Sequence, residues 1–192
     1  MPVTEIDPTS ALVVIDIQKG IVGMPTVHPA AGVLANVVRL VDAFRAANKP
    51  VVLVRVGWTD RDMSDAVQTR NQGPGTPGPL PPDFFEYADE LQADPARDVL
   101  VHKRQWGAFY GTDLDLQLRR RGITQIVLCG IATSIGVEST ARSAYEHNYH
   151  LTFASDAMTD RNADAHDRAL DIIFPRIGEI GTTDEILAKL GR

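Results

Sequence analysis

The sequence predicts an α/β fold with three layers, in which helices cover both faces of a doubly wound, six-stranded parallel sheet. Short apolar runs rich in β-branched residues recur along the chain, as expected for strands that are buried on both faces. Segments with apolar residues at helical spacing separate these runs. This alternation is typical of parallel strands joined by helical crossovers.

Length and charge narrow the classes of function. The 192 residues are expected to form a single domain over 1–192. A net charge of −6 argues against a nucleic acid or an anionic membrane as partner. No apolar run approaches the roughly 18 residues of a membrane span, and residues 1–10 lack the pattern of a signal peptide. The single cysteine fits a reducing compartment. We therefore expect a cytoplasmic protein that acts on a small molecule.

The first expected strand, 11–18, is apolar until Asp16 interrupts it near its end. An aspartate at such a place is often a turn or helix-capping residue. Here a glycine-bearing loop follows, and no helical pattern begins before about residue 31. We therefore expect Asp16 at the carboxyl edge of the sheet in a functional role, with Gln18 in the same pocket. A helix over 31–48 should follow.

The second expected strand, 51–56, ends close to Trp58, a candidate wall of the pocket. Residues 59–82 show no periodic pattern and include the run GPGTPGPLPP. A linker between two domains is one interpretation, but too little chain precedes it for a separate domain. A long irregular connection inside one domain is more often a lid or an interface loop.

The third expected strand, 98–103, ends at Lys103, and three aromatic residues follow in a glycine-bracketed loop: Trp106, Phe109 and Tyr110. A lysine at a strand end is most often solvated. Aromatic side chains beside a strand end are typical of pocket walls, although packing beneath the loop is the alternative for some of them. A helix capped by Thr112 should then run to about residue 122.

The segment 125–150 is expected to form the functional centre of the chain. A buried strand over 125–130 leads into a turn of small residues and then into a helix, which Thr133 or Ser134 is expected to cap. Such a turn directs backbone N–H groups and the positive end of a helix dipole toward one point. In α/β sheets, ligands bind just beyond the carboxyl ends of the strands. A strand over 151–155, a helix over 162–174, an edge strand over 177–180 and a helix capped by Thr183 complete the fold.

Three ordered motifs resemble the isochorismatase-like hydrolase superfamily. GIATSIGVESTA is similar to its nucleophile turn, G-[VI]-x-T-x-x-C-V-x-x-T-A, but Gly136 stands at the cysteine position. Residues 13–18 match V-[VI]-x-D-x-Q, and residues 103–109 match K-x-x-x-[SG]-A-F. The resemblance covers about 11–158. It implies a Rossmann-like, isochorismatase-like fold, catalytic roles for Asp16 and Lys103, and a homo-oligomer, either a dimer or a tetramer.

Gly136 leaves the turn without the nucleophile of the larger branch, which limits the chemistry that the site can perform. Cys129 does not replace the missing nucleophile, because it lies inside the expected strand, where a buried thiol is inert. No histidine at a recognisable motif spacing would activate Thr133 or Ser134. The isochorismatase branch also carries glycine there and hydrolyses a vinyl ether without a covalent step. That branch typically has Ala-His where this chain has Thr133 and Ser134.

The resemblance also bears on metal, backbone and function class. The nicotinamidase branch binds metal through histidines after its second strand, but no histidine lies between His28 and His102 here, so we expect neither a metal nor another cofactor. The superfamily implies a cis peptide bond between Ile131 and Ala132, and a hole for a negative oxygen formed by the N–H groups of Ala132 and Gly136. Thr133 should line this pocket.

Two classes of function stay open. One is a hydrolase that uses Asp16 and Lys103 without a thiol, and the other is a catalytically degenerate binding or structural homo-oligomer.

Overall fold

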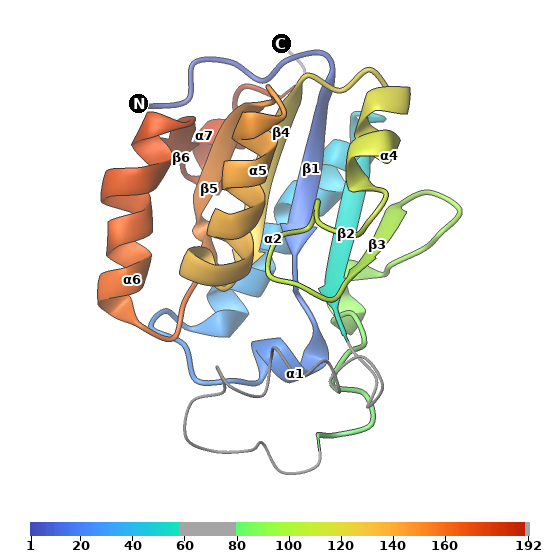
Figure 1. The fold of residues 1–192 in the computed structure, drawn as a ribbon, viewed down its shortest axis with the longest axis vertical. Coiled ribbons are helices and arrows are strands. Elements are labelled where there is room, and N and C mark those ends of the chain that lie inside the picture. The colour runs from blue at the N-terminus through green and yellow to red at the C-terminus, as the bar shows by residue number, and fades with distance from the viewer. Residues whose placement is uncertain (58–79, 191–192) are drawn as a thin grey trace.

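The computed structural model of the chain describes residues 1–57 and 80–190, and these form a sheet covered by helices on both faces (Figure 1). All six strands are parallel, in the order β3-β2-β1-β4-β5-β6. The three-layer, doubly wound sheet predicted from the sequence is confirmed. The strands are β1 (Ser10–Ile15), β2 (Val51–Val56), β3 (Val99–Lys103), β4 (Gln125–Ile131), β5 (His150–Thr159) and β6 (Glu179–Gly181).

The helices divide between the two faces of the sheet. Residues of α2 and α7 share one hydrophobic cluster with the sheet, while residues of α4 and α5 share the other. Within the described part of the chain, no helix is long and apolar enough to cross a membrane. The α-helices are α1 (Lys19–Val22), α2 (Ala30–Ala46), α4 (Leu114–Arg120), α5 (Glu138–Glu146), α6 (Ala163–Arg168) and α7 (Thr183–Leu187).

Strand β1 shows why a continuous apolar run folds as a central strand. Side chains alternate between the two faces of a strand, so every residue of β1 needs a covered face. Leu12 and Val14 pack into the cluster under α2, whereas Val13 and Ile15 pack into the cluster under α5. Each such side chain stabilises the fold by about 1.5–3 kcal/mol when fully buried.

The strand order determines where a ligand can bind. It runs outward from β1 through β2 to β3, then reverses to the other side of β1 with β4. In doubly wound sheets the crevice opens at this point of reversal, outside the carboxyl ends of the two strands. Asp16 follows β1 directly, and the turn that starts at Ala132 follows β4. The topology therefore brings these two segments together.

Several predicted element boundaries differ from the structure. The first strand ends at Ile15 and not at residue 18, because the left-handed backbone of Asp16 turns the chain. A single helical turn, α1, follows the first strand where no helix was expected before residue 31, and one turn is too short to produce a periodic pattern. Strand β5 continues through Asp156 to Thr159 instead of ending at Asp156. Its pairing with β4 shifts in register between Leu128 and Gly130, so the extension is an irregularity of pairing that no local pattern signals.

The predicted helix caps also need correction. Residues Thr133–Val137 form a π-helical turn, and neither Thr133 nor Ser134 caps α5 with its side chain. Thr182, not Thr183, caps α7, in a reciprocal capping box with Glu185. The helix predicted over 162–174 divides into α6, a π-helical segment (Ala169–Ile173) and a 3₁₀ turn (Phe174–Arg176) that accommodates Pro175.

Gly130 provides a test of the packing between β1 and β4. Its φ is +123°, and a Cβ at this position would lie 2.1 Å from the carbonyl oxygen of Ile15. Gly130→Ala should therefore lower the free energy of unfolding by more than about 3 kcal/mol, because backbone strain adds to a clash with backbone. Gly32→Ala on α2 is the control, since its Cβ would meet nothing within 4 Å. It should be neutral or stabilise by up to about 1 kcal/mol in chemical denaturation. Equal effects of the two changes would contradict the prediction.

Candidate active site

Asp16 and Lys103 form a buried ion pair at the carboxyl edge of the sheet. Lys103 Nζ lies 2.7 Å from Asp16 Oδ2, and the two residues are 2% (Lys103) and 5% (Asp16) exposed. Nζ also donates hydrogen bonds to the carbonyl oxygens of Gln105, at 3.2 Å, and Trp106, at 2.9 Å. These three acceptors match the three donors of an ammonium group, so the buried charge is fully hydrogen-bonded.

The backbone of Asp16 is unusual for a residue with a side chain. Its φ is +53°, in the left-handed region that aspartate adopts more readily than most residues. The Asp16 N–H still donates to Val54 O at 3.0 Å, and its own carbonyl oxygen accepts from Gln18 N at 2.9 Å. Asp16 is therefore held at the point where the chain leaves β1.

The second oxygen of Asp16 is the group left available for chemistry. Oδ1 is buried, and no group in the described ranges 1–57 and 80–190 donates a hydrogen bond to it. Burial raises the pKa of Asp16 to about 6, although the charge of Lys103, its hydrogen bond and, more weakly, the backbone of Val56 act in the opposite direction. A carboxyl group with a pKa near neutrality is suited to both giving and accepting a proton.

Gly136 packs directly against this pair. A Cβ at Gly136 would lie 3.1 Å from Asp16 Oδ2, 3.6 Å from Lys103 Nζ and 2.9 Å from Ile15 Cγ2. The structure thus brings together the three residues that the motifs singled out. It also leaves no room for a side chain at position 136 unless Ile15 or Asp16 moves.

The turn after β4 begins with a cis peptide bond between Ile131 and Ala132. The Ala132 carbonyl oxygen accepts hydrogen bonds from Ile135 N at 3.2 Å and Val137 N at 3.1 Å, and so closes the turn on itself. The proposed hole formed by the N–H groups of Ala132 and Gly136 stays a prediction.

Two residues of the turn bond to the segment after β5, which sequence reasoning missed. The hydroxyl of Thr133 lies 2.8 Å from His166 Nδ1, and Ser134 donates through both its N–H and its hydroxyl to Asp160 Oδ2. No motif links Thr133 with a histidine 33 residues away, so only the fold reveals the pair. Thr133 is completely buried. Its hydroxyl ties the turn to the segment after β5.

Gln18 has a structural role in place of the predicted pocket role. Its side-chain amide donates to Val56 O at 2.9 Å and Phe85 O at 3.1 Å, and its Oε1 accepts from Val56 N at 2.8 Å. Backbone groups thus occupy the amide, which joins the end of β1 to the end of β2. The sequence pattern could not distinguish this clamp from a ligand contact.

The aromatic residues separate into two groups. Trp106 and Tyr110 are 66% and 76% exposed. The ring of Phe109 lies 5.1 Å from His147 and 6.0 Å from Tyr149, at the C-terminal end of α5. Helix α5 starts beside Gly136 and has 9 residues, so its C-terminal end lies about 13 Å from that start. Phe109 is therefore a packing residue rather than a pocket wall, and Trp58 lies outside the described residues.

The described residues show neither a second nucleophile at Cys129 nor a metal site. Cys129 is fully buried in β4, and burial raises the pKa of its thiol. A thiol in this state is not a nucleophile. Among the residues with described positions, no three histidine, cysteine or acidic side chains are grouped as metal ligands.

The raised pKa of Asp16 predicts how stability depends on pH. The folded state holds the Asp16 proton more tightly than the unfolded state, so stability should fall as the pH rises from about 4 to about 6. A difference of about 2 pKa units corresponds to about 3 kcal/mol. Asp16→Asn lacks this titration and should become more stable than the wild type above pH 6, as measured by urea denaturation from pH 4.5 to 7.5. A difference between the two proteins that does not change with pH would contradict the prediction.

Comparison with known proteins identifies the family of the chain. Residues 10–185 match the model of the isochorismatase domain. The isochorismatase family proteins YecD of Escherichia coli O157:H7 and YwoC of Bacillus subtilis are 46% and 47% identical to this chain. The alignments cover 95% of this chain and 96% of YecD, and 94% of this chain and 94% of YwoC.

A solved structure of an isochorismatase family protein from Burkholderia thailandensis superimposes with a TM-score of 0.90 at 46% identity, over 98% of both chains. More distant relatives carry named activities. The ureidoacrylate amidohydrolase RutB of Rhizobium rhizogenes is 34% identical over 81% of this chain and 72% of its own length. The N-carbamoylsarcosine amidase of Thermoplasma acidophilum has a TM-score of 0.75 at 27% identity, over 93% of this chain and 98% of its own. The chain belongs to the isochorismatase family and has the fold of its hydrolases.

Proposed function

We propose that the protein hydrolyses a small molecule by proton transfer through Asp16, with Lys103 as the group that orients and charges the site and without a covalent thiol intermediate. The observation that carries this proposal is the buried Asp16 Oδ1, which has no partner in the described chain while its carboxyl group has a pKa of about 6. At neutral pH roughly a tenth of such groups carry a proton, so both the acid and the base form are available.

A vinyl ether is the substrate class that this chemistry suits. Protonated Asp16 gives its proton to the enol-ether carbon, which leaves a positive charge on the carbon bonded to the ether oxygen. Water adds to that carbon and returns a proton to the Asp16 carboxylate. The adduct then collapses to a carbonyl compound and an alcohol. Nearby Lys103 stabilises the carboxylate while the charge is separated, and no step requires a side chain at position 136.

A carbamoyl or ureido compound is the second candidate class. It is favoured by the likeness to RutB and to N-carbamoylsarcosine amidase, whose names specify hydrolysis of such C–N bonds. In this case Asp16 acts as a base toward the attacking water, because Gly136 offers no nucleophile.

A different class of function is a binding or structural protein that keeps the pocket without turnover, and the lack of a nucleophile at position 136 favours it.

A measurement of turnover distinguishes a hydrolase from a binding or structural protein. With a panel of vinyl ethers, amides and small carbamates, Asp16→Asn should lower kcat by at least about 100-fold for any substrate found, since the proton donor is lost. Two controls should keep turnover: Asp42→Asn, whose side chain is 70% exposed on α2, and Cys129→Ala. Thermal stabilisation by a panel compound without turnover would support the binding protein. Loss of turnover in Cys129→Ala with retention in Asp16→Asn would overturn the proposal.

We further propose that the protein is a homo-oligomer, a dimer or a tetramer. Large apolar side chains are exposed along and after β3, including Leu100, Trp106, Tyr110 and Leu116. Exposed apolar side chains of this size are often covered by a partner in an assembly. Light scattering should therefore give a mass that is a multiple of the chain mass. A monomer mass that is independent of concentration would contradict this.

A further inference from the structure

The turn after β4 is held from two sides. On one side Gly136 lies against Ile15 and Asp16, as the close approach of a Cβ at Gly136 shows. On the other side the hydrogen bonds of Thr133 to His166 and of Ser134 to Asp160 tie the turn to the segment that follows β5. The turn is therefore attached both to the end of β1 and to this segment.

The two attachments differ in what else their residues do. Asp160 uses its second oxygen to accept hydrogen bonds from Arg161 N at 2.7 Å and Asn162 N at 3.2 Å, and so also organises the start of α6. The described structure gives the His166 side chain only the 2.8 Å hydrogen bond to Thr133. A change of His166 thus acts on the turn more selectively than a change of Asp160.

We propose that His166 is a positioning residue, which holds the turn closed over Asp16 through its hydrogen bond to Thr133. This inference deepens the proposed function, and any effect of His166 on turnover rests on that function.

The surroundings of His166 favour its neutral form. Burial and the neighbouring His28, whose ring centroid lies 4.8 Å away, lower the pKa of His166, and the carboxylates of Asp167 and Asp160 only partly oppose this. A neutral imidazole has one donor and one acceptor nitrogen. Since the Thr133 hydroxyl can donate or accept, the bond to Nδ1 forms with either tautomer.

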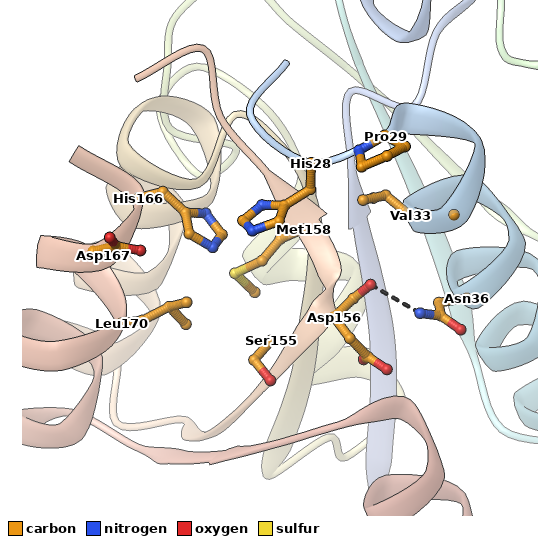
Figure 2. A pocket seen from close by; sticks show the side chains of 11 residues that line it. His28, Pro29, Val33, Asn36, Ser155, Asp156, Met158, His166, Asp167 and Leu170 are labelled. Atoms are coloured by element: carbon orange, nitrogen blue, oxygen red, sulfur yellow. Dashed lines mark hydrogen bonds between the residues drawn. The ribbon is translucent and has the colours of Figure 1, made fainter. Parts of the chain in front are cut away.

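The far side of His166 borders an existing cavity beside Met158 and Leu170, which pack in the cluster under α5. The ring lies in the wall of a cavity of about 530 Å³, with Met158 and Leu170 also in the lining. Figure 2 shows that the ring faces His28. A smaller side chain at position 166 therefore enlarges an existing cavity and does not open a new one in the core. Substitutions here should leave the fold intact.

Two pairs of matched substitutions isolate the hydrogen bond. His166→Asn places an amide near the position of Nδ1, whereas His166→Leu has a similar size and no polar atom. Thr133→Ser keeps the hydroxyl, whereas Thr133→Val replaces it with a methyl group of the same shape. In each pair the members differ mainly in their ability to form the bond.

The readout is the titration of the Asp16 carboxyl carbon, followed by NMR without any substrate. In the wild type its midpoint should lie near 6, since the turn helps to exclude water from Asp16. In His166→Leu and Thr133→Val the midpoint should fall toward the ordinary value of about 4, because the loosened turn admits water. His166→Asn and Thr133→Ser should stay near the wild type. A double variant that combines Thr133→Val with His166→Leu should show the same fall as either single change, since one bond is lost.

A general loss of stability is excluded by Phe44→Leu, which weakens the opposite hydrophobic cluster under α2 and should leave the Asp16 midpoint unchanged. Three results would overturn the inference: an unchanged midpoint in Thr133→Val and His166→Leu, an equal fall in His166→Asn and His166→Leu, or a fall of the same size in Phe44→Leu. If His166→Leu does not fold, the Thr133 pair gives the same decision. Turnover of the Asp16→Asn variant tests the proposed function separately, so the two can fail independently.

Discussion

The buried ion pair between Asp16 and Lys103 is the constraint around which the site is built. Removing two charges from water is costly, and a buried pair is tolerated only when its geometry and remaining hydrogen bonds are good. Lys103 meets this condition with one carboxylate oxygen and two carbonyl oxygens from the loop after β3. Asp16 meets it with one oxygen only. A sheet of this kind gains more stability from apolar packing than from such a pair, so we attribute its presence to chemistry.

The pair also explains the small residue at position 136. The cysteine that the resembling branch carries there would bring its Cβ within 3.1 Å of the Asp16 carboxylate in the present arrangement. Glycine lets the turn approach the pair directly, and that approach contributes to the burial that raises the Asp16 pKa. Gly136 thus provides no thiol and at the same time lies close to the carboxyl group of Asp16. A proton-transfer hydrolase and a degenerate binding protein both start from this geometry.

The turn itself is shaped by contacts that lie far apart in the chain. It stands between β1, through Gly136 and Asp16, and the segment after β5, through Thr133 and His166. Reversal of the strand order between β1 and β4 creates this meeting point, as in other doubly wound sheets. The proposed role of His166 would act on the inner pair through the placement of this backbone, without contact with a substrate.

The sequence by itself determined the alternation of strands and helices, because apolar periodicity is a local property that each segment carries. It also indicated Asp16, Lys103 and Gly136, since each stands in a short ordered motif at the end of a strand. Only the tertiary structure decided that Gln18 clamps two strand ends, that Phe109 packs against the far end of α5, and that His166 reaches Thr133. These contacts join residues 38, 40 and 33 positions apart along the chain. No local pattern encodes such contacts, because they arise where the crossovers of the sheet bring separate segments together.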